Sequence, residues 1–486
     1  MQLPVILDKS SVRPLNQQIS LRIRELIEQG LLGPMDRLPA SRELSAQLGV
    51  SRNTVAAAYQ ELIAQGYLVT RPVRGTYVAG EPPDLQIAEP EPLGIGLGRP
   101  ESYGVLPLPY ASRDQTGLFH AADPSLRIDF AFGRNDPAIF PEKTWRRLTA
   151  ESLAGVAERI TEYGHPLGLE SLRQQVAKRL RATRGMRVDA AHVVIVSGIQ
   201  QGISLVAHML VGSRSRVAIE APCYRGAAFI FESYGASLQD IPVDGGGMRV
   251  EALRDQRPRL VYVTPAHQFP TGAMLALERR IELVGWAQAV GTYLLEVDYD
   301  GDYRYEGQPL PNLHTLDHAG CVIYLNSFSR TIGPGLRLGY LVLPETLLDQ
   351  AVRLKSLMDN GPPWLEQAIL ARFLESGAHD RHLRVLRRTN QVRRNALMET
   401  LLERLPGIRL HGAEGGTHVM AVLPEGAADA AQISAAARRR GIGIHPLASA
   451  ATWMTHHLPR HRHTLLFGYA HLGEAEIRDG LHAAFP

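Results

Sequence analysis

Two segments of the chain combine residue types that hold anions. The run Ser197-Gly198-Ile199 follows the β-branched stretch Val193–Val196 and opens a helical stretch. Backbone N–H groups and the helix dipole can therefore hold a negative charge there. Arg330 and Arg337 lie in a second segment, and guanidinium groups pair bidentately with phosphate or carboxylate. These residues predict a binding site for a phosphorylated or carboxylated molecule.

Lysine is rare in this chain, which limits the chemistry that such a site could perform. Of the 52 basic residues, 48 are arginines and only four are lysines. The lysines are Lys9, Lys143, Lys178 and Lys355. Only a lysine amine can lose its proton and attack an aldehyde to form an imine, because a guanidinium stays protonated.

The segment from Leu38 to Ala79 has the pattern of two helices joined by a tight turn. Ser41 is placed to cap a short first helix, and Gly49 permits the left-handed backbone of the turn. Ser51 is placed to cap a second helix from Arg52 to about Gln65. Helical spacing predicts that the inner face of this helix carries Val55, Tyr59, Leu62 and Ile63. In helix-turn-helix proteins the first residues of the second helix meet DNA, so the pattern predicts a DNA-binding module.

Two short β runs follow the second helix. They cover Tyr67–Thr70 and Thr76–Val78, and the sequence Arg71-Pro72-Val73-Arg74-Gly75 separates them. This arrangement predicts a hairpin with a cationic tip, which is the wing of a winged helix.

The chain divides into three regions by composition and period. Residues 1–80 form the predicted DNA-binding domain, and residues 81–125 are rich in Pro, Gly and acidic residues without a sustained period, as in a linker. In residues 126–486, short apolar runs alternate with helical stretches, which predicts an α/β domain with a mostly parallel sheet. The predicted strands are Val193–Val196, Arg216–Ile219, Leu260–Val263, Tyr293–Leu295 and Val322–Leu325. The last hundred residues, with helices near 362–376 and 380–403, predict a smaller α/β subdomain.

The segment LPASRELSAQLGVSRNTVAAAYQELIAQGYLVTRPVRGTYVA strongly resembles the winged helix of the GntR family of transcription regulators. The resemblance implies that the chain binds double-stranded operator DNA. It places the DNA contacts at Arg42, Ser51, Arg52, Asn53, Thr54, Arg71, Arg74, Gly75 and Thr76.

Phrases of the large domain resemble fold-type I aminotransferases, and in particular the MocR subfamily of GntR regulators. Among them are YGHPLGLESLRQQVAKRLRATRG, YVTPAHQFPTGAML, LLEVDYDGDYRY and LNSFSRTIGPGLRLGY. The resemblance implies the aminotransferase fold, a homodimer and a site for pyridoxal phosphate. Its site residues fall on Ser197, Gly198, Ile199, Tyr224, Gln268, Asp298, Tyr299, Ser327, Ser329, Arg330 and Arg337.

Two positions depart from the family pattern. The lysine that forms the imine in the family is Arg330 here. The aspartate that pairs with the pyridinium nitrogen aligns with Val297, and a protonated ring nitrogen without its partner costs about 3–5 kcal/mol. Asp298 could substitute only if the backbone shifted by one residue, because alternation along a strand directs its side chain to the other face. Two such replacements indicate that imine chemistry is lost, so we expect no covalent cofactor and no catalytic residue.

Composition excludes several other classes of protein. The chain has no apolar run of about 18 residues and no recognisable signal peptide, so we expect no membrane contact and a cytoplasmic location. Two cysteines, Cys223 and Cys321, are too few for a disulfide framework. The segment MTHHLPRHRH gathers four histidines, but Pro459 breaks the helix that would align them, which predicts a solvated loop and no metal site.

The sequence therefore predicts a DNA-binding regulator whose aminotransferase-like domain senses a small anionic ligand without a Schiff base. Two alternatives stay open. One is a pyridoxal-phosphate-responsive regulator with residual aminotransferase activity, which an imine absorbance band would identify. The other is a ligand-free regulator whose large domain serves only as a dimer scaffold, which an absence of stabilisation by any ligand would identify.

Overall fold

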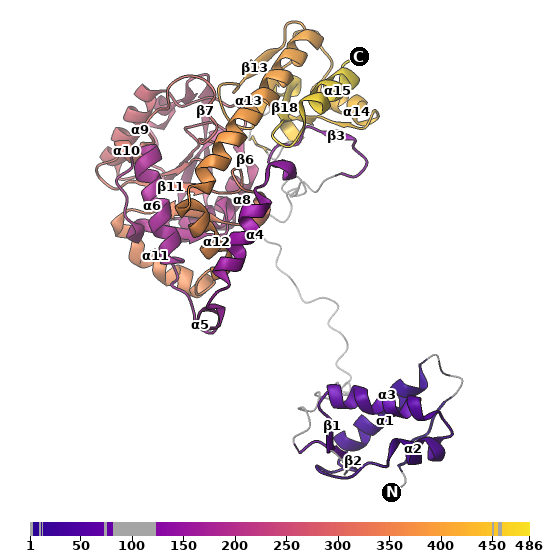
Figure 1. The fold of residues 1–486 in the computed structure, drawn as a ribbon. Helices are drawn as coiled ribbons and strands as arrows, with labels where there is room; N and C mark the ends of the chain where they lie inside the picture. Colours follow the sequence, from indigo (N-terminus) through magenta and orange to yellow (C-terminus); the bar gives the residue numbers. More distant parts are fainter. Residues whose placement is uncertain are drawn as a thin grey trace, which may run out of the picture. The chain divides into compact units, whose positions relative to one another are not determined.

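The computed structural model describes residues 3–8, 11, 13–71, 75–80, 123–449, 452–454 and 459–486. The chain forms two compact units, residues 1–105 and 106–486, and the boundary falls inside the predicted linker. Figure 1 labels the elements of both units. Among the described residues, no helix is long and apolar enough to cross a membrane.

The first unit consists of three helices and a two-stranded sheet. The helices are α1 (Leu15–Glu28), α2 (Ser41–Leu48) and α3 (Arg52–Ala64), and the strands are β1 (Leu68–Arg71) and β2 (Gly75–Val78). The strands pair antiparallel, as a wing does, and Arg71 lies over the Tyr77 ring at 5.6 Å. Arg74, at the predicted tip, lies outside the described residues.

The small core of this unit tests the helix predictions. Val55, Tyr59 and Leu62 of α3 are buried as predicted, whereas Ile63 is 37% exposed and Ala58 takes an inner position instead. Gly49 ends α2 with φ +63°, which confirms the left-handed turn. The predicted cap at Ser41 is wrong, because Ser41 is the first helical residue and Ala40 precedes it without a side-chain hydrogen bond.

The second unit is built on an eight-stranded sheet in the order β4-β12-β11-β10-β9-β5-β7-β8. The strands are β4 (Val193–Val196), β5 (Arg216–Ala221), β7 (Ser237–Asp244), β8 (Gly247–Met248), β9 (Leu260–Val263), β10 (Tyr293–Val297), β11 (Val322–Ser327) and β12 (Gly339–Val342). The strands from β11 to β7 in this order run parallel, whereas β12 is antiparallel to both of its neighbours. The five predicted strands are confirmed, and β7, β8 and β12 were not predicted.

Helices cover both faces of this sheet, which explains the continuous apolar runs of its strands. One face packs on α7 (Ile199–Leu210), α8 (Arg225–Ser233) and α11 (Glu345–Met358). The other packs on α4 (Glu142–Ser152), α6 (Glu170–Arg184), α9 (Leu277–Val290), α10 (Leu313–Leu316) and α12 (Trp364–Glu375). Successive residues of one strand therefore enter different cores: Val194 faces the first group and Ile195 the second.

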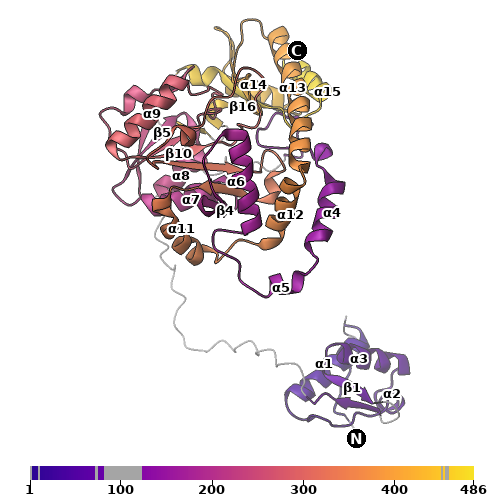
Figure 2. The ribbon, with the colours of Figure 1, turned by 60° about the vertical axis from the view of Figure 1, so that its left-hand side comes forward.

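A smaller subdomain completes the second unit, as predicted. Its sheet has the order β13-β14-β18-β16, and its helices include the long α13 (Ala378–Arg404), which leads from α12 towards α15 (Figure 2). The sheet consists of β13 (Arg409–His411), β14 (His418–Val422), β16 (His445–Pro446) and β18 (Thr464–Gly468), beside α14 (Ala430–Arg438) and α15 (Glu474–Ala484). Short pairs tie the subdomain to distant segments, namely β3 (Ile128–Asp129) with β15 (Ile442–Gly443) and β6 (Cys223–Tyr224) with β17 (Thr452–Trp453). One further short helix, α5, spans Val156–Ile160.

Candidate functional site

The first turn of α3 presents polar side chains to solvent. The Ser51 hydroxyl accepts a hydrogen bond from the Thr54 N–H at 3.1 Å, which confirms Ser51 as the N-cap. Arg52 and Asn53, between these two residues, are exposed to solvent. The other described residues of the predicted DNA surface are likewise exposed or partly exposed, namely Arg42, Arg71, Gly75 and Thr76.

The predicted phosphate-binding residues meet at the start of α7. The Arg337 Nη2 donates a hydrogen bond to the Ser197 carbonyl at 2.7 Å. A Cβ on Gly198 would lie 2.8 Å from Arg337 Nη2, so only glycine lets the guanidinium cross there. Gly339 of β12 brings Ser327 to the same place, since a Cβ on Gly339 would lie 3.2 Å from Ser327 Cβ and 3.1 Å from Gly198 Cα. A guanidinium, a hydroxyl and a helix N-terminus thus converge on one spot.

Arg330 lies in the turn that joins β11 to β12, directly after Ser329, and protein groups fix its position. Its carbonyl accepts hydrogen bonds from the Tyr303 hydroxyl at 2.6 Å and from Asn135 Nδ2 at 3.0 Å. Its guanidinium lies 3.7 Å from the buried carboxylate of Asp300 and 5.9 Å from the centre of the Tyr299 ring. The Arg330 guanidinium, a permanent cation, thus has a buried counter-ion.

Aromatic rings form the walls beside these cations. Phe269 makes edge contacts with Tyr224 and with Tyr299, at centroid distances of 6.3 and 6.4 Å. Burial raises the pKa of Tyr224, while the nearby Arg330 and Arg337 charges act in the opposite direction, so both arginines lie close to this ring. We call the nine predicted residues of the segments that meet here the motif site: Ser197, Gly198, Ile199, Tyr224, Tyr299, Ser327, Ser329, Arg330 and Arg337.

Asp298 faces away from the motif site, which corrects its inclusion there. Val297 enters the apolar core under α7 and α8, whereas Asp298 lies on the opposite side of the sheet. Its Oδ2 accepts hydrogen bonds from the Tyr324 hydroxyl at 2.6 Å and from Arg184 Nε at 3.2 Å. The Asp298 carboxylate is thus engaged on the opposite side of the sheet from the apolar side chain of Val297.

Gln268, also predicted in this site, has its amide hydrogen-bonded to other protein groups. Its Nε2 donates to the Phe269 and Pro222 carbonyls at 2.6 and 2.7 Å, and its Oε1 accepts from the Thr271 N–H and hydroxyl. The amide therefore shapes the loop after β9 instead of facing a ligand. Beside it lies a residue that sequence reasoning missed, the buried Glu220, which accepts hydrogen bonds from the Thr264 hydroxyl and N–H. Burial raises the Glu220 pKa to about 7.

A buried cluster of His267, Asp300 and His418 contacts two residues of the motif site, Tyr299 and Arg330. Their ligand atoms lie within 4.8 Å of one another, which is the arrangement of a candidate metal site. The partners of these groups support a different role. Each histidine Nε2 faces a backbone carbonyl at 3.1 Å, while His267 Nδ1 contacts the Tyr299 hydroxyl at 3.2 Å. Asp300 already accepts two hydrogen bonds from Thr417 and faces the Arg330 charge, which would repel a metal ion.

Protonation of this cluster follows from its burial. Desolvation lowers the pKa of His418 well below its ordinary value, and the charges of His267 and Arg330 act in the same direction. Burial, with Asp300 next, raises the pKa of Tyr299 well above its ordinary value. The ring of His418 is therefore neutral and the Tyr299 hydroxyl keeps its proton. His267 and Asp300 lie within the motif phrases, but the sequence predicted no role for them, and it gave no signal for His418.

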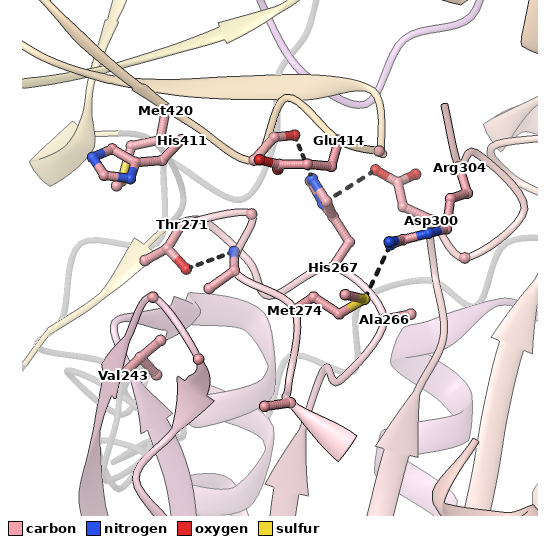
Figure 3. Close-up of a pocket in the computed structure, with 18 of the residues that line it drawn as sticks. Val243, Ala266, His267, Thr271, Met274, Asp300, Arg304, His411, Glu414 and Met420 are labelled. Carbon is pink, nitrogen blue, oxygen red and sulfur yellow. Dashed lines mark hydrogen bonds and ion pairs between the residues drawn. The ribbon is translucent and has the colours of Figure 1, made fainter. Parts of the chain in front are cut away.

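A cavity of about 1030 Å³ adjoins this cluster, and His267 and Asp300 contribute to its lining (Figure 3). We call it the loop cavity. It is lined by the loops after β7, β9 and β10 and by β13 and β14 of the smaller subdomain, including Val243, His267, Met274, Asp300, Arg304 and Met420. None of the nine motif-site residues lines it, and Asp298 is the one predicted residue that does. His461, from the predicted solvated loop, is instead buried and lines this cavity, while His456 and His457 lie outside the described residues.

None of the lysines that the structure describes replaces the missing amine. Lys355 is fully buried, but its ammonium is bonded to Asp359. Asp359 also accepts from Gln201, whose Oε1 in turn accepts the Ser197 N–H at 2.6 Å. Lys355 therefore acts two links away from the motif site, and Lys143 and Lys178 are exposed.

The residues present fit one end of pyridoxal phosphate and not the other. The Ser197–Ile199 turn, Ser327 and Arg337 suit a phosphate. Arg330 cannot form an imine, and Val297 offers a ring nitrogen no charge partner. The motif site can bind an anion and can stack an aromatic ring, but it holds no group for the covalent chemistry.

Comparisons with known proteins agree with both halves of this description. Residues 15–78 match the family described as bacterial regulatory proteins, gntR family, and residues 128–454 match aminotransferase class I and II. The "Probable rhizopine catabolism regulatory protein MocR" of Rhizobium meliloti is 32% identical, over 99% of this chain and 94% of that protein. The "HTH-type pyridoxine biosynthesis transcriptional regulator PdxR" of Corynebacterium glutamicum is 32% identical, over 86% and 85%. In structure, the multiple substrate aminotransferase of Thermococcus profundus matches 75% of this chain and 91% of its own, with a TM-score of 0.67 and 27% identity.

Proposed function

The chain belongs to the MocR subfamily of GntR transcription regulators, and from this premise we propose that it binds operator DNA and senses a small anionic molecule without forming a Schiff base. The single observation that carries the proposal is the setting of Arg330. A guanidinium paired with the buried Asp300 lies where the family has a reactive amine, beside residues suited to a phosphate.

The proposed ligand carries a phosphate or carboxylate on a flat, uncharged ring. Arg337, Ser327 and the start of α7 would hold the anion. Tyr224 and Phe269 would contact the ring, and the apolar Val297 favours a ring nitrogen without a proton. Arg330 would accept a second electronegative group of the ligand, because its guanidinium donates hydrogen bonds and cannot be consumed by reaction.

Regulation follows if the ligand prefers one of two arrangements of the protein. We propose a homodimer in which ligand binding changes the spacing of the two winged helices. A ligand can shift this equilibrium only by the difference between its affinities for the two arrangements. Asn53 and Arg52, exposed on the first turn of α3, are the residues that we expect to meet the operator.

Thermal unfolding of the full-length protein with inorganic phosphate or pyridoxal phosphate tests the proposal. We expect both to raise the melting temperature, because a ligand that binds only the native state stabilises it by about 2.7 kcal/mol at 100 times its Kd. Arg337→Gln should weaken binding roughly 10- to 150-fold, the equivalent of about 1.5–3 kcal/mol for a charged hydrogen bond. Arg254→Gln, which removes an exposed arginine paired with Glu282, is the matched control. Stabilisation by none of the ligands would contradict the proposal and favour a dimer scaffold.

A further inference from the structure

The loop cavity contains a guanidinium that has no charged partner. Arg304 directs its Nη1 at the sulfur of Met274, 3.0 Å away (Figure 3). Its Nε is buried and has no hydrogen-bond partner in the described part of the chain. No carboxylate of the described residues lies within 4.0 Å of the group. A thioether is a weak acceptor, so this contact satisfies the partly exposed guanidinium only weakly.

Two better-buried arginines of this cavity are paired with protein acceptors. Arg280 donates to three backbone carbonyls, those of Leu275, Pro265 and Pro311. Arg184 pairs with Asp298 and with Asp302. Arg304 thus differs from these two arginines, because a thioether is the one acceptor that the described residues offer its guanidinium.

Four arginines and four carboxylates line the cavity, so its charge depends on which of them are already paired. Three of its four carboxylates are already paired with a guanidinium: Asp244 with Arg279, Asp298 with Arg184 and Asp300 with Arg330. Only Glu414 of the four carboxylates remains, and its side chain is exposed. One anionic group beside Arg304 would therefore be balanced, whereas a second would face Glu414.

The rest of the lining is suited to an apolar body. Val243, Met274, Leu410, Met420 and Leu447 contribute aliphatic or thioether surface. A volume of about 1030 Å³ is at the upper end of the range for small-molecule sites. The lining thus combines an apolar wall with the guanidinium of Arg304, for which the described residues offer no carboxylate; Arg409, also in the lining, is exposed.

We propose that the loop cavity is a second ligand site, which binds a small monoanion with an apolar body through the guanidinium of Arg304. The anion replaces the Met274 sulfur as the acceptor of the Arg304 Nη1–H and also accepts the neighbouring Nη2–H. This site is separate from the motif site, but the two share the wall formed by His267 and Asp300. His267 contacts Tyr299 at 3.2 Å and Asp300 faces Arg330. A ligand in the loop cavity therefore changes the contacts that hold these two residues of the motif site.

Hexanoate, a carboxylate on an apolar chain, is the probe for this site. Isothermal titration of the full-length protein should show binding in the parent and an unchanged affinity in Arg254→Gln. Arg304→Gln should weaken it at least tenfold, and Arg337→Gln, which affects only the motif site, should leave it unchanged. If Arg304→Gln does not fold, Arg304→Lys is the alternative variant. It keeps the charge but loses the paired N–H donors of the guanidinium, so it should bind hexanoate several-fold more weakly than the parent.

Other outcomes would overturn the proposal. They are no binding of hexanoate by the parent, equal binding by the Arg304 variants, or loss of binding in Arg337→Gln. The last would place the carboxylate in the motif site. Failure of phosphate to bind through Arg337 would contradict the function proposed for the motif site and would leave the loop cavity unaffected.

Discussion

Replacing Glu220 with glutamine should remove a large pH dependence from the stability of the aminotransferase-like unit. The side chain is 1% exposed, and its carboxylate accepts hydrogen bonds only from neutral groups, Thr264 and Gln268. Burial raises its pKa from the ordinary 4.5 to about 7. At about 1.4 kcal/mol for each pH unit, this difference corresponds to roughly 3 kcal/mol.

The sign follows from linkage between protonation and folding. The folded pKa is above the unfolded one, so the native state holds the proton more tightly. The stability that Glu220 contributes is therefore complete below pH 4.5 and is lost as the pH rises to about 7. Glutamine cannot ionise, so Glu220→Gln should equal or slightly lower the parent's stability at pH 4.5 and exceed it by up to about 3 kcal/mol at pH 8.

Urea unfolding followed by tryptophan fluorescence measures this effect in the full-length protein. All four tryptophans lie in the second unit, at positions 145, 286, 364 and 453, so the signal reports that unit alone. Glu278→Gln, at an exposed carboxylate of α9, is the matched control and should follow the parent at every pH. If Glu220→Gln kept the parent's full pH dependence between 4.5 and 8, the reasoning about this buried carboxyl would be refuted.

Three further predictions concern the winged helix and the motif site. Ser51→Ala should destabilise α3 by about 1 kcal/mol through loss of its cap, seen as faster amide hydrogen exchange confined to that helix; unchanged exchange would show that the cap contributes nothing. Arg52→Gln should weaken operator binding and reduce its salt dependence by about one counter-ion, measured by fluorescence anisotropy over a salt series; a steeper or equal slope would place Arg52 off the DNA. Arg330→Lys should give a chain that borohydride labels with pyridoxal phosphate at that position, by peptide mass mapping, even though Val297 leaves the ring nitrogen unpaired; an unlabelled variant would mean that the site excludes the aldehyde.

The strands of the large sheet were predictable because they are buried on both faces. Val193–Val196 and Leu260–Val263 are unbroken apolar runs, and the structure reproduces their bounds. The strand β7 was missed because it lies near the edge of the sheet, where only Ile241 and Val243 of its residues are buried. Its alternating pattern is interrupted by Pro242, which weakens the signal of a strand.

The motif site was predictable where backbone geometry requires particular residues. Gly198, with φ +88°, has no room for a Cβ beside Arg337, and such a glycine marks the turn in the sequence itself. Strand alternation likewise indicated that Val297 and Asp298 face opposite sides, as the structure shows. The placement of Gln268 could not be predicted, because its amide partners include Pro222, brought close only by the folded sheet.

The loop cavity was beyond sequence reasoning for the same reason. Its lining comes from loops after three strands and from a subdomain more than a hundred residues later in the chain. Arg304 lies within a motif phrase, yet nothing local distinguishes it from the 47 other arginines. Only its contact with Met274 instead of a carboxylate singles it out.

Intact-mass spectrometry after borohydride reduction with pyridoxal phosphate shows whether this chain forms an imine at the motif site. With Arg330 in the position of the amine, we expect the mass of the native protein to be unchanged, while the Arg330→Lys variant gains one cofactor. A stoichiometric adduct on the native chain, mapped by peptide digestion to a lysine that reaches the motif site, would contradict this expectation.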